Sequence, residues 1–170
     1  MNQATLKDAN TLLADMATQL RSLLEQQQIT DPVMIGIQTG GVWVAEALHK
    51  ALTLKQPLGT LNITFYRDDF TRIGMHPQVT PSNLPFEVDD QHIILVDDVL
   101  HTGRTIRAAL NEIFDYGRPA SVILVCMVER TGRELPISAD IAGQKLDLTE
   151  GQQIKLNGPS PLILTLLENM

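Results

Sequence analysis

The spacing of apolar positions divides the chain into segments with helical and strand-like patterns. Apolar residues recur at helical spacing in three segments: 5–27, 42–51 and 106–114. Continuous apolar runs, typical of strands buried on both faces, occupy three further segments: 33–37, 93–96 and 121–128. The alternating stretch 60–66 predicts a strand with one drier face. Strands that alternate with helices in this way predict an α/β domain with a mostly parallel sheet flanked by helices.

Two regions depart from this alternation. Residues 67–84 form a long polar segment with several prolines and a glycine, which favours either a lid or a disordered insertion. Near the C-terminal end, residues 154–156 and 162–167 predict two closing strands, with a turn at Asn157-Gly158-Pro159 between them. Another turn is predicted at Asp89-Asp90, directly before a buried strand.

Composition limits the class of protein. A chain of 170 residues makes one ordinary domain, and its net charge of −7 disfavours non-specific binding to nucleic acid or to anionic membranes. No apolar run approaches the length of a membrane span, and the polar N-terminus predicts no signal peptide. The only cysteine, Cys126, lies in an apolar run and is expected to be buried. A single cysteine without an internal disulfide partner agrees with a cytoplasmic location.

The candidate chemistry begins at residues 93–105. A buried strand there is followed by two carboxylates, Asp97 and Asp98, then by a loop containing Thr102 and Gly103, then by a helix. Loop amides and a helix N-terminus at the carboxyl end of a parallel strand form an anion site suited to phosphate. Beside a phosphate, the carboxylates are suited to accept hydrogen bonds from ribose hydroxyls or to hold a divalent metal ion through water. The simpler alternative is that this loop only caps the helix.

A second strand–loop–helix unit has a similar form. Gln38-Thr39-Gly40-Gly41 follows the strand at 33–37 and precedes the helix at 42–51. A glycine pair alone more often marks a tight turn. Together with residues 93–105, however, it predicts a second phosphate-binding loop.

Residues 93–105 closely resemble the phosphoribosyl pyrophosphate (PRPP) motif of type I phosphoribosyltransferases. Segments 61–70, 116–120 and 133–137 resemble the PyrR family, whose members regulate pyrimidine operons and act as uracil phosphoribosyltransferases. The resemblance implies one phosphoribosyltransferase domain over residues 1–170, with a mobile loop at 67–84 and a small hood from about residue 129 to the end. It also implies that uracil and PRPP give UMP and pyrophosphate, with Mg²⁺, in a homodimer or higher homo-oligomer.

The resemblance assigns roles to individual residues. Asp97 and Asp98 would face the ribose and the metal ion, Thr39, Gly40 and Gly41 would hold the pyrophosphate, and Arg67, with Arg72 as a further candidate, would contact pyrophosphate from the loop. The 5′-phosphate would lie against the residues that follow the acidic pair: Val99, Leu100, His101, Thr102, Gly103, Arg104 and Thr105. The base would lie in the hood, near Glu129, Arg130 and Arg133. Arg133 has an alternative partner in its neighbour Glu134.

Two departures from the PyrR pattern leave alternatives open. The family commonly has Lys-Thr-Arg-Gly where this chain has Gln38-Thr39-Gly40-Gly41, so two cations are absent from the pyrophosphate loop. The hood motif also lacks one His and one Arg, and the chain is acidic, which disfavours binding to RNA phosphates. The alternatives are a nucleotide-sensing RNA-binding regulator with little catalysis, a phosphoribosyltransferase for another base such as a purine, and, least favoured, a flavodoxin-like or receiver domain.

Overall fold

The computed structural model describes residues 5–63 and 81–168. Its helices are α1 (Ala9–Gln26), α2 (Gly40–Leu52) and α4 (Arg104–Tyr116). Its strands are β1 (Val33–Ile37), β2 (Gly59–Leu61), β3 (His92–Leu100), β4 (Ser121–Arg130), β5 (Ile141–Leu146), β6 (Gln152–Asn157) and β7 (Ile163–Glu168). Strands β2-β1-β3-β4-β5 form a five-stranded sheet in which every pairing is parallel, and β6 and β7 form a separate antiparallel pair. The predicted fold class is therefore confirmed.

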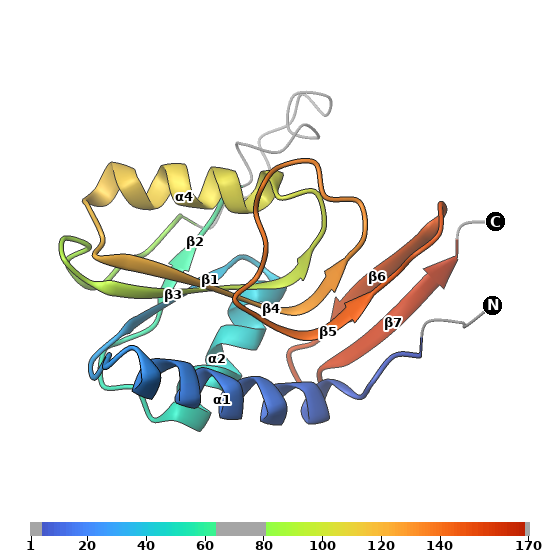
Figure 1. Cartoon of the computed structure of the whole chain (residues 1–170), viewed down its shortest axis with the longest axis horizontal. Coiled ribbons are helices and arrows are strands. Elements are labelled where there is room, and N and C mark those ends of the chain that lie inside the picture. Colours follow the sequence, from blue (N-terminus) through green and yellow to red (C-terminus); the bar gives the residue numbers. More distant parts are fainter. Residues whose placement is uncertain (1–4, 64–80, 169–170) are drawn as a thin grey trace.

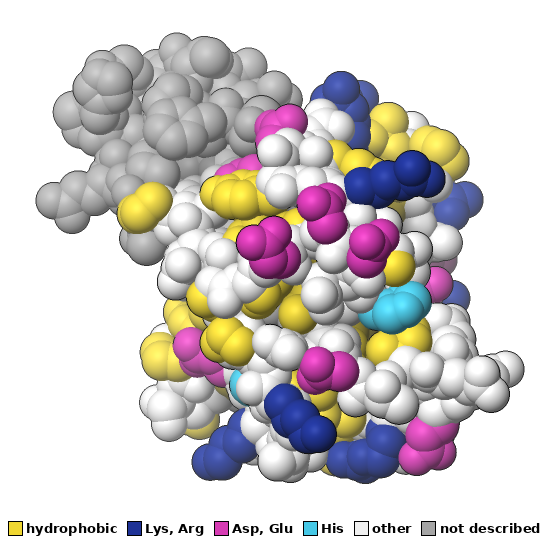
Figure 2. All heavy atoms as spheres, turned by 90° about the vertical axis from the view of Figure 1, so that its left-hand side faces the viewer, with side chains coloured by type: hydrophobic (Ala, Val, Ile, Leu, Met, Phe, Trp, Pro, Cys, Tyr) yellow, Lys and Arg dark blue, Asp and Glu magenta, His cyan; other side chains and the backbone are white. Residues whose placement is uncertain are grey.

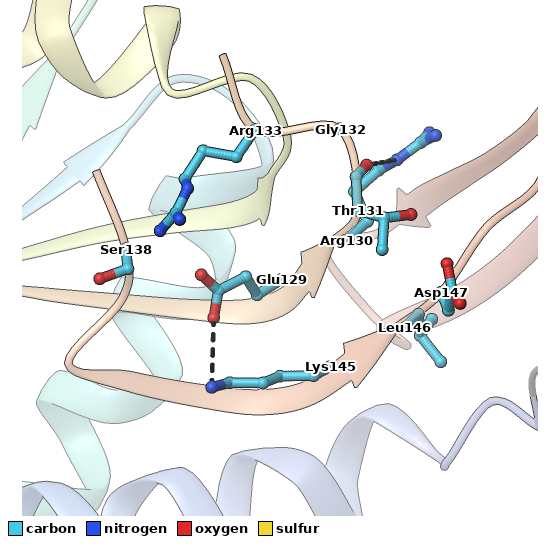
Figure 3. Close-up of a pocket in the computed structure, with 9 residues that line it drawn as sticks. All are labelled: Glu129, Arg130, Thr131, Gly132, Arg133, Ser138, Lys145, Leu146 and Asp147. Carbon is cyan, nitrogen blue, oxygen red and sulfur yellow. Dashed lines mark hydrogen bonds and ion pairs between the residues drawn. The ribbon is translucent and has the colours of Figure 1, made fainter. Parts of the chain in front are cut away.

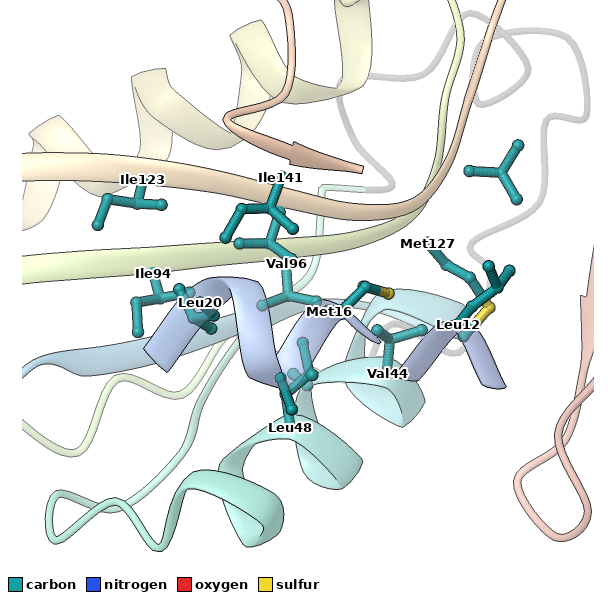
Figure 4. Close-up of a cluster of buried hydrophobic side chains, with 14 of the residues drawn as sticks. Leu12, Met16, Leu20, Val44, Leu48, Ile94, Val96, Ile123, Met127 and Ile141 are labelled. Atoms are coloured by element: carbon teal, nitrogen blue, oxygen red, sulfur yellow. The ribbon is translucent and has the colours of Figure 1, made fainter. Parts of the chain in front are cut away.

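The helices cover both faces of the sheet: α1 and α2 lie on one face and α4 on the other (Figure 1). Successive residues of β3 alternate between these faces, because side chains along a strand point to opposite sides. Ile94 and Val96 pack with Leu12, Met16 and other side chains of the α1–α2 layer (Figure 4). Ile93 and Leu95 pack instead under α4, where Cys126 is also buried. Both faces of the strand are apolar, as its continuous apolar run predicts.

Helix α1 is shorter than the predicted segment 5–27. It begins at Ala9, because the Asp8 carboxylate accepts hydrogen bonds from the backbone N–H groups of Asn10 (3.1 Å) and Thr11 (3.3 Å). An aspartate in this position satisfies the first free N–H groups of a helix. Apolar spacing alone does not locate this start, because Leu6 also packs against the core although it precedes the helix.

Several strands differ from the sequence prediction, and one of them is β2, which ends at Leu61, within the predicted segment 60–66. Strand β3 continues four residues beyond Val96, and its later residues pair with β4 up to Leu100 opposite Glu129, so the acidic pair lies within the strand. Strand β5 was not predicted, since it contains Gly143 and polar residues of low strand propensity. Pairing with β4 nevertheless makes it a strand, and Gly143 leaves room for α1: a Cβ there would lie 3.0 Å from Met16 Sδ.

The end of the predicted loop 67–84 is fixed to its surroundings. Thr60 and Asn83 exchange two backbone hydrogen bonds of 2.8 Å, which pair the chain before residue 64 with the chain after residue 80. The Asn62 N–H donates to Ser82 Oγ (2.8 Å), and the Ser82 hydroxyl donates to Glu112 Oε1 in α4 (2.6 Å). The predicted turn at Asp89-Asp90 is present, with Asp89 Oδ1 accepting the Arg118 N–H at 2.8 Å.

The end of the molecule at which β1, β3 and β4 begin carries interspersed acidic, basic and apolar side chains rather than one continuous basic field (Figure 2). No helix in the described part of the chain is long and apolar enough to cross a membrane.

Candidate functional site

The carboxyl ends of β1, β3 and β4 bring three loops to one edge of the sheet. The loop after β1 contains Thr39, Gly40 and Gly41; the loop after β3 contains residues 101–103; the segment after β4 begins at Thr131. Parallel strands that are neighbours in the sheet end side by side. Segments about 60 and 30 residues apart in the sequence therefore meet at this edge.

Asp97 and Asp98 are held in different environments on β3. Asp97 is 5% exposed, and its Oδ1 accepts the Asp98 N–H at 2.9 Å. Asp98 is half-buried, and its Oδ1 accepts the Val99 N–H at 2.8 Å. These bonds fix each carboxylate against the strand backbone, so the acidic pair is preorganised at the end of the central strand.

The glycines of the β1–α2 loop lie directly against the acidic pair. A Cβ on Gly40 would collide with Asp98 Oδ2, and a Cβ on Gly41 would lie 2.7 Å from the Val96 carbonyl oxygen. Only glycine fits this approach without a shift of the backbone or of Asp98. The two strand–loop–helix units singled out in the sequence are therefore parts of one site. Glycine, rather than the arginine common in the family, fits at position 40 because the backbone there lies directly against the Asp98 carboxylate.

The loop after β3 offers mainly backbone groups. The Leu100 side chain is buried in the core and the partly buried Val99 side chain packs against it, so of the predicted phosphate residues these two offer mainly backbone to the surface. Gly103 has a φ of +95°, a conformation that favours glycine, and precedes α4 as its N-cap. Thr102 Oγ1 accepts the Arg104 N–H at 3.2 Å. Thr102, Gly103, Arg104 and Thr105 thus place the N-terminus of α4, where backbone N–H groups attract an anion, at this edge of the sheet.

The same loop is bound to the segment that follows β4. The Thr102 carbonyl oxygen accepts the N–H groups of Glu134 (3.0 Å) and Leu135 (3.1 Å). Arg104 Nε lies 2.7 Å from Glu134 Oε2, so the alternative pairing of Glu134 with Arg133 is wrong. We call segment 132–137, which contacts the loop after β3, the bridging segment.

His101 lies against the bridging segment. A Cβ on Gly132 would lie 2.7 Å from His101 Nε2, which shows how closely the ring approaches the backbone there. Desolvation and the nearby positive charge of Arg130 lower the pKa of His101 below its ordinary value, against an opposing effect of Glu134. The lowered pKa favours the neutral form of His101, in which the ring offers the loop hydrogen-bonding groups rather than a positive charge.

A hollow of about 610 Å³ opens beside the ends of β4 and β5 (Figure 3). It brings together all three residues predicted to bind the base: Glu129, Arg130 and Arg133. Arg130 points away from Glu129 and donates to the Gln152 carbonyl oxygen (3.1 Å), whereas Arg133 points toward Glu129. The pocket is also lined by Ser138, Lys145 and Asp147, which the sequence pattern does not predict. Lys145 lies in the unpredicted strand β5 and Asp147 directly follows it, whereas Ser138 lies in the segment between β4 and β5.

The donor set suits a hard divalent cation. Within residues 5–63 and 81–168 no group of three or more His, Cys, Asp or Glu side chains could hold a metal ion alone. Asp97 and Asp98 provide only two carboxylates, and Mg²⁺ is commonly bound by one or two carboxylates together with water and substrate phosphates. Arg67 and Arg72, predicted to contact pyrophosphate, lie outside the described residues.

Comparison with known proteins agrees with this geometry. Residues 2–156 match the family model of the phosphoribosyl transferase domain. The chain is 64% identical over 155 residues to the Bifunctional protein PyrR of Nitrosococcus oceani, covering 90% of this chain and 88% of that protein. It is 60% identical over 160 residues to the Bifunctional protein PyrR of Pseudomonas paraeruginosa, covering 94% of each.

Solved structures share the fold at low sequence identity. A purine phosphoribosyltransferase from Pyrococcus horikoshii superimposes with a TM-score of 0.60 at 22% identity, covering 81% of this chain and 82% of that one. A hypoxanthine phosphoribosyltransferase from Staphylococcus aureus gives a TM-score of 0.65 at 16% identity, covering 86% and 78%. At these identities the likeness establishes the fold alone.

Proposed function

The chain belongs to the phosphoribosyl transferase domain family and, within it, to the PyrR family, and from this membership we propose that it joins uracil to PRPP, forming UMP and pyrophosphate. The observation that carries the proposal is the contact between the β1–α2 glycine loop and the acidic pair of β3. This contact places a predicted pyrophosphate loop, two carboxylates and a predicted 5′-phosphate loop around one position, as a doubly phosphorylated sugar requires.

In the proposed reaction a bond forms between the uracil ring nitrogen N1 and the anomeric carbon of the ribose. The bond from that carbon to pyrophosphate breaks, and the N1 proton is released. The half-buried carboxylate of Asp98 is proposed to stabilise the positive charge that develops on the ribose. Backbone groups of residues 99–105 and the N-terminus of α4 hold the 5′-phosphate, and Thr39, Gly40 and Gly41 hold the pyrophosphate.

Mg²⁺ fits this arrangement as a companion of PRPP. Asp97 and Asp98 are proposed to hold it together with water and oxygen atoms of the substrate. When bound, Mg²⁺ would supply charge neutralisation for the pyrophosphate leaving group. The β1–α2 loop has no arginine or lysine of its own, so backbone N–H groups, Mg²⁺ and Arg67 are proposed to share this task.

The decisive experiment measures UMP formation from uracil and PRPP with Mg²⁺, using wild type and Asp98→Asn. Removal of an electrostatic stabiliser of the transition state should lower kcat by about a hundredfold or more. The unfolding transition should not change, because the amide keeps the shape of the side chain. Wild-type turnover in Asp98→Asn would contradict the proposed role, and a preference for hypoxanthine or guanine over uracil would favour the purine alternative.

Binding to pyrimidine-operon RNA is the second candidate function, favoured by the name "bifunctional" that the relatives share. The net charge of −7 argues against it, because RNA binding depends on cation–phosphate contacts. A titration of the protein's own pyrimidine-operon leader RNA at two salt concentrations distinguishes the two. Tight binding that weakens steeply with salt would establish RNA binding as a function of the protein. Its absence would leave catalysis as the only proposed function.

We also propose that the protein acts in the cytoplasm as a homo-oligomer. The buried free thiol of Cys126 is compatible with a reducing compartment, and the oligomer follows from PyrR membership. Light scattering of the purified chain measures the assembly directly, and a mass of 18.8 kDa at micromolar concentration would contradict it.

A further inference from the structure

The first turn of α2 follows the proposed pyrophosphate loop directly, and the side chain of its N-cap residue does not cap it. Thr39 is that residue, and it makes no capping side-chain hydrogen bond, in contrast to Asp8 at the start of α1. The N–H groups of Val42 and Trp43 donate to the Thr39 carbonyl oxygen at 3.2 and 3.4 Å. The Thr39 side chain therefore leaves the first N–H groups of the helix to a ligand, and packing has to hold the turn in place.

Packing on the sheet side of this turn consists of close backbone contacts. A Cβ on Gly41 would lie 2.7 Å from the Val96 carbonyl oxygen, and a Cβ on Gly36 would lie 2.8 Å from Val42 Cα. Gly36 belongs to β1 and Val96 to β3, so both strands touch the start of the helix. These contacts prevent the turn from moving toward the sheet, but they do not prevent it from moving away.

Trp43 provides a contact on another side of the turn. Its indole ring packs against the core on the α1–α2 face of the sheet. The turn between β6 and β7 reaches back to α2 (Figure 1). A Cβ on Gly158, in that turn, would lie 3.0 Å from Cε3 and 3.3 Å from Cδ2 of the indole. The Trp43 ring is thus held between the core and the hairpin of β6 and β7.

The hairpin is itself fixed to the core. Leu156 of β6 is buried, and Leu164 and Leu166 of β7 pack against the same core cluster, whereas Ile163 is 52% exposed on the outer face. This alternation gives the hairpin one apolar face, which anchors it to the α1–α2 side of the sheet. The anchored hairpin places its turn beside the Trp43 ring, so the C-terminal part of the chain supports the start of α2.

The composition of the loop makes this support important. Gln38-Thr39-Gly40-Gly41 contains no arginine or lysine, so it would hold pyrophosphate mainly through backbone N–H groups. A long cationic side chain can adjust to the position of an anion, whereas a backbone N–H points only where the turn directs it. A small displacement of the turn therefore moves every donor of the loop at once.

We propose that Trp43 is a positioning residue for pyrophosphate binding: its ring, held between the core and the β6–β7 turn, fixes the first turn of α2 so that the N–H groups of the loop meet the pyrophosphate of PRPP. The hairpin thereby supports the reaction without touching the substrate. This inference rests on the proposed phosphoribosyltransferase activity and adds to it the means by which a loop without cations is kept in place.

The test compares Trp43→Ala, Trp43→Phe and Gly158→Ala with wild type. Trp43→Ala should raise the KM for PRPP by about tenfold or more and leave the KM for uracil within about twofold, because only the pyrophosphate loop is displaced. Trp43→Phe keeps a flat ring and should recover most of the affinity for PRPP. Gly158→Ala disturbs the same contact from the exposed turn and should raise the KM for PRPP by about threefold.

Leu52→Ala is the matched control. Leu52 is partly buried against the same core cluster, but it lies at the other end of α2. Its KM for PRPP should stay within about twofold of wild type, although the variant loses buried apolar contacts. An equal rise of both KM values in Trp43→Ala, or the same rise for PRPP in Leu52→Ala, would indicate general destabilisation and overturn the inference.

Gly158→Ala keeps the test valid if Trp43→Ala folds poorly, because Gly158 is exposed. An unchanged KM for PRPP in Gly158→Ala would then overturn the inference. If wild type turns over no base, the proposed enzyme fails, and the inference is tested by calorimetry with pyrophosphate and Mg²⁺. It then predicts binding that Gly158→Ala weakens and Leu52→Ala retains. No binding to wild type, or equal affinity in all three proteins, would overturn it.

Discussion

One end of the candidate site, residues 39–41 and 97–105, is proposed to hold phosphate and is called here the phosphate end. It is built from backbone groups and glycines packed against the central strands, whereas the pocket beside Glu129 is lined by charged side chains at the ends of β4 and β5. At the phosphate end a single added carbon atom would meet the Val96 carbonyl or the Asp98 carboxylate. In the pocket, Lys145 is largely exposed and pairs only loosely with Glu129. The difference suggests that the phosphate end is constrained by folding, and the pocket mainly by the ligand it selects.

Of the substitutions proposed at the phosphate end, Gly41→Ala should have the largest effect on stability, and it tests whether the phosphate end tolerates added volume. A Cβ at Gly41 would lie 2.7 Å from the Val96 carbonyl oxygen and 3.0 Å from Asp97 Cα, both backbone atoms that cannot move aside cheaply. Gly41→Ala should therefore lower the free energy of unfolding by about 1–3 kcal/mol, as overpacking does. Urea denaturation measures this loss.

Thr39→Ala, in the same loop, is the control for Gly41→Ala. Thr39 is exposed and its side chain makes no capping hydrogen bond, so the free energy of unfolding should change by less than about 0.5 kcal/mol. Equal stability of the two variants would show that the phosphate end tolerates added volume. The proposed contrast between the two regions would then be lost.

Gly103 lies where the phosphate end contacts the bridging segment, so a substitution there tests whether that contact affects ligand binding. Its φ of +95° is strained for alanine, and a Cβ would lie 3.3 Å from Leu135 Cβ in the bridging segment. Gly103→Ala should cost about 1–2 kcal/mol of stability and weaken UMP binding in calorimetry. Gly151→Ala, at a φ of +87° before β6, should lose similar stability yet bind UMP normally. Loss of UMP binding in both variants would point to general destabilisation.

The smallest expected effect is a pH dependence at His101. Its folded pKa is lowered below the ordinary value of 6.5, so the unfolded chain binds the proton more tightly. The stability contributed by neutral His101 is therefore present above that value and is lost as the pH falls through it toward the folded pKa. Urea midpoints measured from about pH 7.5 down to about pH 5 should fall less in His101→Gln than in wild type. Parallel curves would contradict this.

The sequence predicts the phosphate end of the candidate site well and the pocket beside Glu129 poorly. Continuous apolar runs located β1, β3 and β4, and the glycines and acidic pair at their ends located the phosphate end, because these signals lie within single short segments. The pocket depends on Lys145, Ser138 and Asp147, whose strand or loop has no apolar pattern of its own. Strand β5 forms because β4 offers it a partner, and no local pattern carries that information.

The ion pair of Glu134 could not be predicted from the sequence either. Glu134 has Arg133 as its neighbour in the chain, yet it pairs with Arg104, 30 residues away. The backbone bonds from Glu134 and Leu135 to Thr102 set this choice, since they bring the bridging segment onto the loop after β3. The last four residues of β3 were likewise not predicted, because Asp97 and Asp98 interrupt the apolar run although the strand continues through them.

The hydrogen bonds from Glu134 and Leu135 to the Thr102 carbonyl have a consequence for the size of the ligand. They join the loop proposed to hold the 5′-phosphate to the segment that leads out of the pocket, so the span between the two subsites is set by the protein backbone rather than by the nucleotide. A molecule that reaches both subsites must span this fixed separation, with a phosphate at one end and a base at the other, as the proposed product UMP has. We therefore expect UMP to bind at both subsites at once, whereas a free base or a sugar phosphate should bind at only one and therefore more weakly.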